Sequence, residues 1–137
     1  MSQTRLPAEL RQLVRARAGG CCEYCRLPDW VEWSGPFHVE HVVARQHGGG
    51  EDVANLAWAC SRCNYRKGPN LSAVDPDGAG IVPLFHPRRD RWAEHFALEG
   101  ARVRGLTPAG RATVWLLQMN AERRLELRAQ LIREGLW

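Results

Sequence analysis

The stretch from residue 60 to residue 68 reads CSRCNYRKG, and it decides how this chain folds. Its polar residues recur at helical spacing, so a short helix is predicted to project four side chains from one face: Cys60, Cys63, Asn64 and Lys67. A second Cys-x-x-Cys pair, Cys22 and Cys25, precedes it, with Cys25 lying 35 positions before Cys60. The two pairs are expected to meet around this helix.

Two Cys-x-x-Cys pairs supply the four thiolates of a tetrahedral structural zinc site. Such a site binds only the folded arrangement, which is typically worth on the order of 10 kcal/mol to a fold with little apolar core. Cys22 is preferred as the first ligand because the spacing from Cys21 to Cys25 is one residue too long. Cys21 stays the alternative, and buried free thiols or a redox pair are the competing interpretation.

Hydrophobic patterning predicts the elements around these pairs. Apolar residues at helical spacing predict a helix over residues 6–18, which Gly19 and Gly20 end. Two strands are expected over residues 37–43 and 53–59, joined by a glycine turn, with a short helix from about residue 61 to Gly68. Residues 70–87 are expected to form a surface loop with a turn at 75–78. Helices are expected from Thr107-Pro108 and over about 120–134.

The composition fits one α+β domain over residues 1–137. Apolar residues make up 45% and charged residues 25% of the 137 residues, which excludes overall disorder. No apolar run approaches the roughly 20 residues of a membrane span. The first ten residues lack the apolar centre of a signal peptide. We therefore expect a cytoplasmic protein with a small zinc-stapled centre over residues 20–70, flanked by N-terminal and C-terminal helices.

The charge distribution favours an acidic partner such as DNA. The formal net charge is +4, and residues 1–87 hold 9 basic and 9 acidic side chains. Residues 88–137 hold 10 arginines against 6 acids, so the whole surplus lies there. This segment is expected to be a helical, basic extension that contacts phosphates. The sequence indicates no oligomeric state.

Between the cysteine pairs, the sequence resembles the HNH endonucleases with their ββα-metal core. The resemblance rests on four motifs: Val39-Glu40-His41-Val42, Gly48-Gly49, Asn55-Leu56 and the CSRCNYRKG stretch. It covers roughly residues 20–70. Three positions depart from the common pattern: Glu40 replaces an aspartate, Ala44 a proline, and Asn64 the third signature histidine. The resemblance implies a metal-dependent nuclease that hydrolyses DNA, with RNA left as an alternative.

The residue types fit phosphodiester hydrolysis. An ordinary histidine pKa near 6.5 lets His41 accept a proton from water as general base. Glu40 and Asn64 offer oxygen ligands, which suit a catalytic Mg²⁺ or Mn²⁺. The resemblance gives Asn55 the task of orienting the base. Lys67 is placed for phosphate contact, and His38, two residues before Glu40, is a weaker candidate for the same role.

Two other functions compete with the nuclease. One is a non-catalytic, zinc-stabilised nucleic-acid-binding module, which would not need Glu40, His41 and Asn64. The other is an adaptor with an aromatic partner surface made of four residues: Trp92, Phe96, Trp115 and Trp137. Tryptophans at helical spacing more often fill cores, so the adaptor is the weaker of the two.

Overall fold

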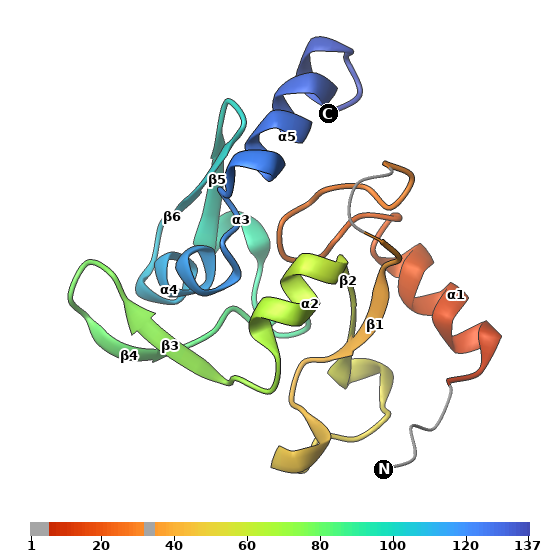
Figure 1. The fold of residues 1–137 in the computed structure, drawn as a ribbon. Coiled ribbons are helices and arrows are strands. Elements are labelled where there is room, and N and C mark those ends of the chain that lie inside the picture. Colours follow the sequence, from red (N-terminus) through yellow and green to blue (C-terminus); the bar gives the residue numbers. More distant parts are fainter. Residues whose placement is uncertain (1–5, 32–34) are drawn as a thin grey trace.

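The computed structural model describes residues 6–31 and 35–137, whose arrangement Figure 1 shows. In chain order the longer elements of the first half are α1 (Ala8–Arg17), β1 (His38–His41), β2 (Leu56–Ala59), α2 (Ser61–Lys67), β3 (Ser72–Asp75) and β4 (Gly80–Pro83). The second half holds α3 (Trp92–His95), β5 (Phe96–Glu99), β6 (Arg102–Gly105), α4 (Pro108–Leu117) and α5 (Glu122–Arg133). No helix among these residues is both long and apolar enough to cross a membrane.

The centre of the fold is the antiparallel pair β1–β2 with α2 beside it (Figure 1). Glu40 pairs with Ala57 and His41 with Leu56, and every residue of β2 is buried. α1 packs against β2, and its one fully buried residue, Val14, joins the core. The predicted strands and the predicted helices over 6–18 and from residue 61 are confirmed, with the start of the second strand forming the 3₁₀ turn Val53–Asn55.

The expected surface loop over residues 70–87 is wrong, because this segment contains the β3–β4 hairpin. The turn at 75–78 is confirmed and joins the two strands. Val74 and Ile81 face each other across the strands and are 58% and 75% exposed, so no buried alternation marked the hairpin. A polar contact attaches the hairpin to α4. Both carboxylate oxygens of the buried Asp75 accept hydrogen bonds from Arg111 of α4.

The expected helical extension over residues 88–137 is confirmed only in part. Thr107 caps α4 by accepting a hydrogen bond from the backbone N–H of Gly110, as its sequence predicted, and α5 is present. The extension also contains the β5–β6 hairpin, which was not predicted. α4 packs against β6, β3 and α2, so one helix joins both hairpins to the centre of the fold.

A single apolar core runs through both halves of the chain. Phe85 packs edge-on against Phe96, with ring centroids 5.0 Å apart, and the indole N–H of Trp92 donates to the Tyr24 carbonyl at 2.8 Å. Phe96 is 1% exposed, and Trp92 and Trp137 pack against the core. The four aromatic residues of the adaptor hypothesis therefore do not form one exposed surface; Trp115 alone of them is largely exposed.

We predict that Asp75→Asn destabilises the protein by releasing the β3–β4 hairpin from Arg111. The hydrogen bond from Arg111 lowers the pKa of Asp75 to about 2. A lowered pKa stabilises the fold fully above the unfolded value of about 4, and this contribution is lost as the pH falls toward 2. The melting-temperature gap between wild type and variant should therefore be largest near pH 7 and shrink between about pH 4 and 2.

Asp77→Asn is the matched control, because this exposed carboxylate also lies near Arg111, at 3.3 Å. It should change the melting temperature far less than Asp75→Asn. A gap for Asp75→Asn that stays constant from pH 7 to pH 2 would contradict the assignment.

Candidate active site and metal centre

Four buried cysteines from two distant segments meet at one point. The sulfur atoms of Cys22, Cys25, Cys60 and Cys63 all lie within 4.8 Å of one another. Cys21 is half-buried and lies outside this group, so Cys22 is the first member of the cluster and Cys21 is the spare thiol. All five cysteines are free of disulfide bonds. The four-thiol cluster suggests structural zinc.

Within each Cys-x-x-Cys pair, a backbone N–H group is directed at a cysteine sulfur. The backbone N–H of Cys25 points at the sulfur of Cys22 (3.5 Å), and that of Cys63 points at the sulfur of Cys60 (3.4 Å). Tetrahedral zinc with Zn–S distances of about 2.3 Å separates its sulfurs by about 3.8 Å. The sulfurs of Cys25 and Cys60 lie 3.8 Å apart. These donors fit a closed, tetrahedral site.

Two buried arginines of α5 cover the cluster. The guanidinium of Arg124 donates to the sulfur of Cys63 at 3.1 Å and to the Leu117 carbonyl at 2.7 Å. Arg128 is fully buried and donates to the carbonyls of Cys25 and Met119 at 3.3 and 2.8 Å. Burial lowers the pKa of Arg124, but the charges of the nearby cysteine sulfurs outweigh it and raise this pKa overall. The two arginines therefore bring positive charge to an electron-rich cluster.

Glu40 of β1 forms a buried charge pair with Lys67 of α2. Its Oε1 accepts from the hydroxyl of Tyr24 at 2.6 Å, and its Oε2 lies 2.7 Å from Nζ of Lys67. Burial raises the pKa of Glu40, while the Lys67 ammonium and the two hydrogen bonds oppose that rise. The pair holds the middle of β1 against the end of α2.

The position of Lys67 differs from the phosphate contact expected from the sequence. Its side chain is 2% exposed, and Nζ also donates to the Val42 carbonyl at 2.7 Å. Both contacts direct the ammonium inward, so the charge of Lys67 serves Glu40 and the backbone after β1. A lysine at the end of a helix gave no sign of this burial, because its partner lies 27 positions away in the sequence.

Nε2 of His41, the last residue of β1, forms a hydrogen bond with a carboxylate oxygen of Glu51. Arg45 in turn binds the other oxygen of Glu51 at 2.8 Å. A carboxylate can only accept, so Nε2 carries the proton and Nδ1 of the neutral ring holds the lone pair. The hydrogen bond from His41 lowers the pKa of Glu51. Sequence reasoning missed Glu51, and its only signal was an acid directly after three glycines.

Asn55 fixes the loop that follows His41. Its Oδ1 accepts from the backbone N–H of Val43 at 2.8 Å, and its Nδ2 donates to the carbonyls of Val43 and Gly50 at 3.0 and 2.9 Å. Gly49 passes so close that a Cβ there would lie 1.7 Å from the Val43 oxygen. The amide and the glycine together close the loop against β1, beside His41 and Glu51.

Asn64 and His38 lie along α2. Asn64 is half-exposed and stands one turn from both Ser61 and Lys67. His38 approaches Ser61, with Nε2 and Oγ 3.5 Å apart, and burial lowers its pKa. Ser61 and Lys67 are about 9 Å apart along the helix at about 1.5 Å per residue. His38 therefore lies at the opposite end of α2 from the Glu40–Lys67 pair.

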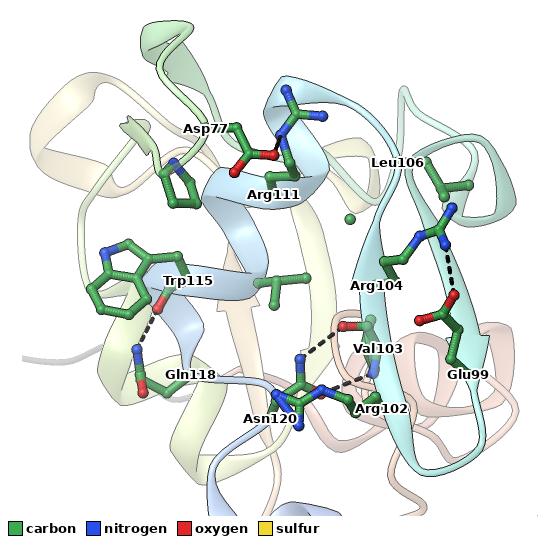
Figure 2. A pocket seen from close by; sticks show the side chains of 13 residues that line it. Asp77, Glu99, Arg102, Val103, Arg104, Leu106, Arg111, Trp115, Gln118 and Asn120 are labelled. Carbon is green, nitrogen blue, oxygen red and sulfur yellow. Dashed lines mark hydrogen bonds and ion pairs between the residues drawn. The ribbon is translucent and has the colours of Figure 1, made fainter.

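A separate groove of about 670 Å³ lies between α4 and the β5–β6 hairpin (Figure 2). Trp115, 60% exposed, stands at one side of it. Two of its three arginines are already paired: Arg104 with Glu99 at 2.6 Å, and Arg111 with Asp77 and the buried Asp75. The dashed lines in Figure 2 mark two of these pairs, Arg104 with Glu99 and Arg111 with Asp77. The groove presents little unbalanced positive charge to an anion.

A comparison with known protein families agrees with this geometry. The family model described as HNH endonuclease matches residues 22–70, which contain both cysteine pairs, the β1–β2 strands and α2. Neither the curated proteins nor the solved structures contain a match to the chain. The match points to a nuclease-type function and to metal binding. Residues 22–70 of this chain are therefore similar to the HNH endonuclease family.

Proposed function

We propose that this chain is a metal-dependent endonuclease that hydrolyses phosphodiester bonds of DNA. The observation that carries the proposal is the His41–Glu51 pair, held by Asn55 at the end of β1 inside the matched segment. A histidine whose orientation and tautomer are fixed by a carboxylate is the usual form of a general base. Neither rival function requires such a pair.

His41 acts as the general base. Glu51 binds the proton on Nε2, so Nδ1 accepts a proton from the attacking water, and its oxygen then forms the new bond to phosphorus. The carboxylate stabilises the resulting imidazolium, which makes proton transfer easier. Asn55 prevents the loop from moving away, so it is a positioning residue and does not touch the reacting atoms.

Glu40 and Asn64 are the proposed ligands of one Mg²⁺ or Mn²⁺. A carboxylate and an amide oxygen suit these hard cations, and the two residues come from β1 and α2, which pack against each other. Bound there, the cation would neutralise charge on the scissile phosphate and on the departing oxygen. The present partner of Glu40 is Lys67, so cation binding requires Lys67 to release Oε2. The lysine then acts as the counter-charge of Glu40 when no cation is bound.

The four cysteines are proposed to hold structural zinc. Four thiolates around Zn²⁺ leave a net charge of −2, which is costly in a buried setting. The guanidinium groups of Arg124 and Arg128 supply two positive charges at this point. The two positive guanidinium groups balance the net charge of −2 on the zinc site, and this balance supports zinc bound by four thiolates.

DNA is the proposed partner, and the burial of several arginines changes which of them we propose for contact with its phosphates. Arg124 and Arg128 are buried, Arg88 pairs with Glu23, and Arg111 pairs with Asp75, so much of the basic extension serves the fold. The exposed arginines near the core include Arg62 and Arg66 of α2 and Arg89 after β4. These are better placed for phosphate contact than the buried arginines of α5.

The alternative is a non-catalytic, zinc-stabilised nucleic-acid-binding module. One observation favours it: the charge of Glu40 is already neutralised by Lys67, as it would be in a site that never holds a cation. In that case the pair is structural, and the His41–Glu51 pair has no catalytic role. Cleavage of DNA by the purified protein separates the two functions.

We predict that wild-type protein nicks or cuts supercoiled plasmid when Mg²⁺ or Mn²⁺ is added, and that His41→Ala lowers the rate by about 10²–10⁴. Glu51→Gln should lower the rate less, because the imidazole of His41 can still accept a proton and loses only the carboxylate that stabilises its charged form. Asp52→Asn, an exposed neighbour of Glu51, is the matched control and should cleave normally. Undiminished cleavage by His41→Ala would reject the mechanism. No cleavage by the wild type would favour the binding module.

Lys67→Met tests whether Glu40 is a cation ligand. Removal of the ammonium leaves a buried, unpaired carboxylate, which should destabilise the cation-free protein and bind Mn²⁺ more tightly. Calorimetric titration should show a Mn²⁺ dissociation constant several times lower than that of the wild type, together with a larger stabilisation by Mn²⁺. The double variant Lys67→Met/Glu40→Gln should lose both effects. An unchanged Mn²⁺ affinity in Lys67→Met would exclude Glu40 as a ligand.

For the cysteine cluster, we predict one zinc ion per chain by elemental analysis. Cys60→Ser should lose the ion and much of the fold. Arg124→Met should keep zinc but release it faster to a chelator, because the negative site loses its closest positive charge. Arg123→Met, at the exposed neighbouring position, should release zinc at the wild-type rate. Equal rates for the Arg124 and Arg123 variants would show that the arginine does not stabilise the site.

A further inference from the structure

A cleft of about 430 Å³ opens beside the proposed active site. Most of the residues that line it lie outside the segment 22–70 that matches the family model. One side is formed by Val42 and Val43, directly after His41, and by Lys67 at the end of α2. The other sides come from the β3–β4 hairpin and from the turn that contains His86 and Arg89. Among the described residues, none of those that line this cleft carries a carboxylate. It therefore differs from the groove at α4, where acids pair with the arginines.

The ring of His86 has a fixed orientation and a fixed tautomer. Its Nδ1 accepts hydrogen bonds from the backbone N–H groups of Arg88 and Arg89, at 3.1 and 3.3 Å. A neutral imidazole that accepts at Nδ1 carries its proton on Nε2. Asp90 completes the turn by accepting from the backbone N–H of His86 at 2.9 Å. The polar group that this ring offers to the cleft is therefore the Nε2–H donor.

Burial, followed by the positive charge of Arg89, favours the neutral form of the His86 ring. Burial lowers the pKa of His86, and the positive charges of Arg89 and Lys67 lower it further, against a smaller opposite effect of Asp90. The ring is thus a permanent hydrogen-bond donor at neutral pH, and it adds no carboxylate or acceptor that would repel an anion. Its role does not depend on titration.

Arg89 supplies the charge next to that donor. Its side chain is exposed at the rim of the cleft, and it forms no ion pair with any residue that the structure describes. Asn70 and Ser72 add an amide and a hydroxyl to the same rim. A guanidinium, a neutral N–H donor and small polar groups around an acid-free cleft match the chemistry of a phosphodiester.

We propose that this cleft binds a phosphodiester group of the DNA strand next to the scissile one, through Nε2–H of His86 and the guanidinium of Arg89. The proposal rests on the proposed function for its choice of ligand. The cleft begins at the residue after His41, so a strand whose scissile phosphate lies at His41 continues toward it. His86 and Arg89 would then set the path of the strand.

The test uses DNA binding by the full-length, zinc-loaded protein without Mg²⁺ or Mn²⁺, measured by fluorescence anisotropy with a labelled duplex. His86→Asn keeps an acceptor where Nδ1 lies and removes the Nε2–H donor, whereas His86→Gln can restore a donor near the Nε2 position. Arg89→Ala removes the charge, and Arg91→Ala is the exposed control. Melting temperatures confirm that each variant is folded.

We expect His86→Asn and Arg89→Ala to weaken binding by about 3- to 10-fold, and His86→Gln and Arg91→Ala to bind within about twofold of the wild type. The salt dependence separates the two contacts: the slope of log Kd against log salt should fall by about one for Arg89→Ala and stay unchanged for His86→Asn. Wild-type affinity in a folded His86→Asn, or an equal loss in Arg91→Ala, would overturn the proposal.

A second measurement distinguishes a strand from a free anion. The imidazole nitrogen signals of His86 should shift on addition of the duplex and remain unchanged in millimolar inorganic phosphate at constant ionic strength. A shift with phosphate alone would overturn the strand assignment. Plasmid cleavage is scored separately, so His86-dependent binding without cleavage rejects the endonuclease, and cleavage with normal binding by His86→Asn rejects only this cleft.

Discussion

Four sulfur atoms within 4.8 Å of one another set the geometry on which the rest of this structure depends. They join the turn at residues 22–25 to the first turn of α2, and α2 carries the residues that face β1. Two short strands and a seven-residue helix bury too little surface to fix such positions unaided. The cluster supplies the missing constraint, and Arg124 extends it to α5 through its bond to the sulfur of Cys63.

Buried charge pairs refine this frame. Glu40 with Lys67, and Glu23 with Arg88, each connect segments far apart in the sequence, and each removes charged groups from water. Such pairs are costly unless both partners stay in place, so they favour one arrangement over near alternatives. The result is a β1–α2 contact with little freedom. The His41–Glu51 pair is more open to solvent than either of these buried pairs.

The sequence predicted the elements and clusters that follow from short-range spacing. Both cysteine pairs, the strands around Glu40 and His41, α2 and the capped start of α4 could be derived because each has a local signature. The β3–β4 hairpin could not, because its attachment depends on Asp75 reaching Arg111, 36 positions away. Glu51 and the burial of Lys67 were missed for the same reason: which partner a charge meets is decided by the tertiary fold. The catalytic assignments of Glu40, His41, Asn55 and Asn64 stay predictions.

The contact between Arg124 and Cys63 also orders events during synthesis. The two residues are 61 positions apart, and a ribosome completes both cysteine pairs long before it adds the arginine. A nascent chain can therefore assemble its four thiols, and take up a metal, while the cluster still lacks its positive cover. The unfinished protein would carry an exposed, exchangeable site. The contacts of Arg124 and Arg128 with this cluster can form only after α5 has been made, so they are the last to be added around the four thiols.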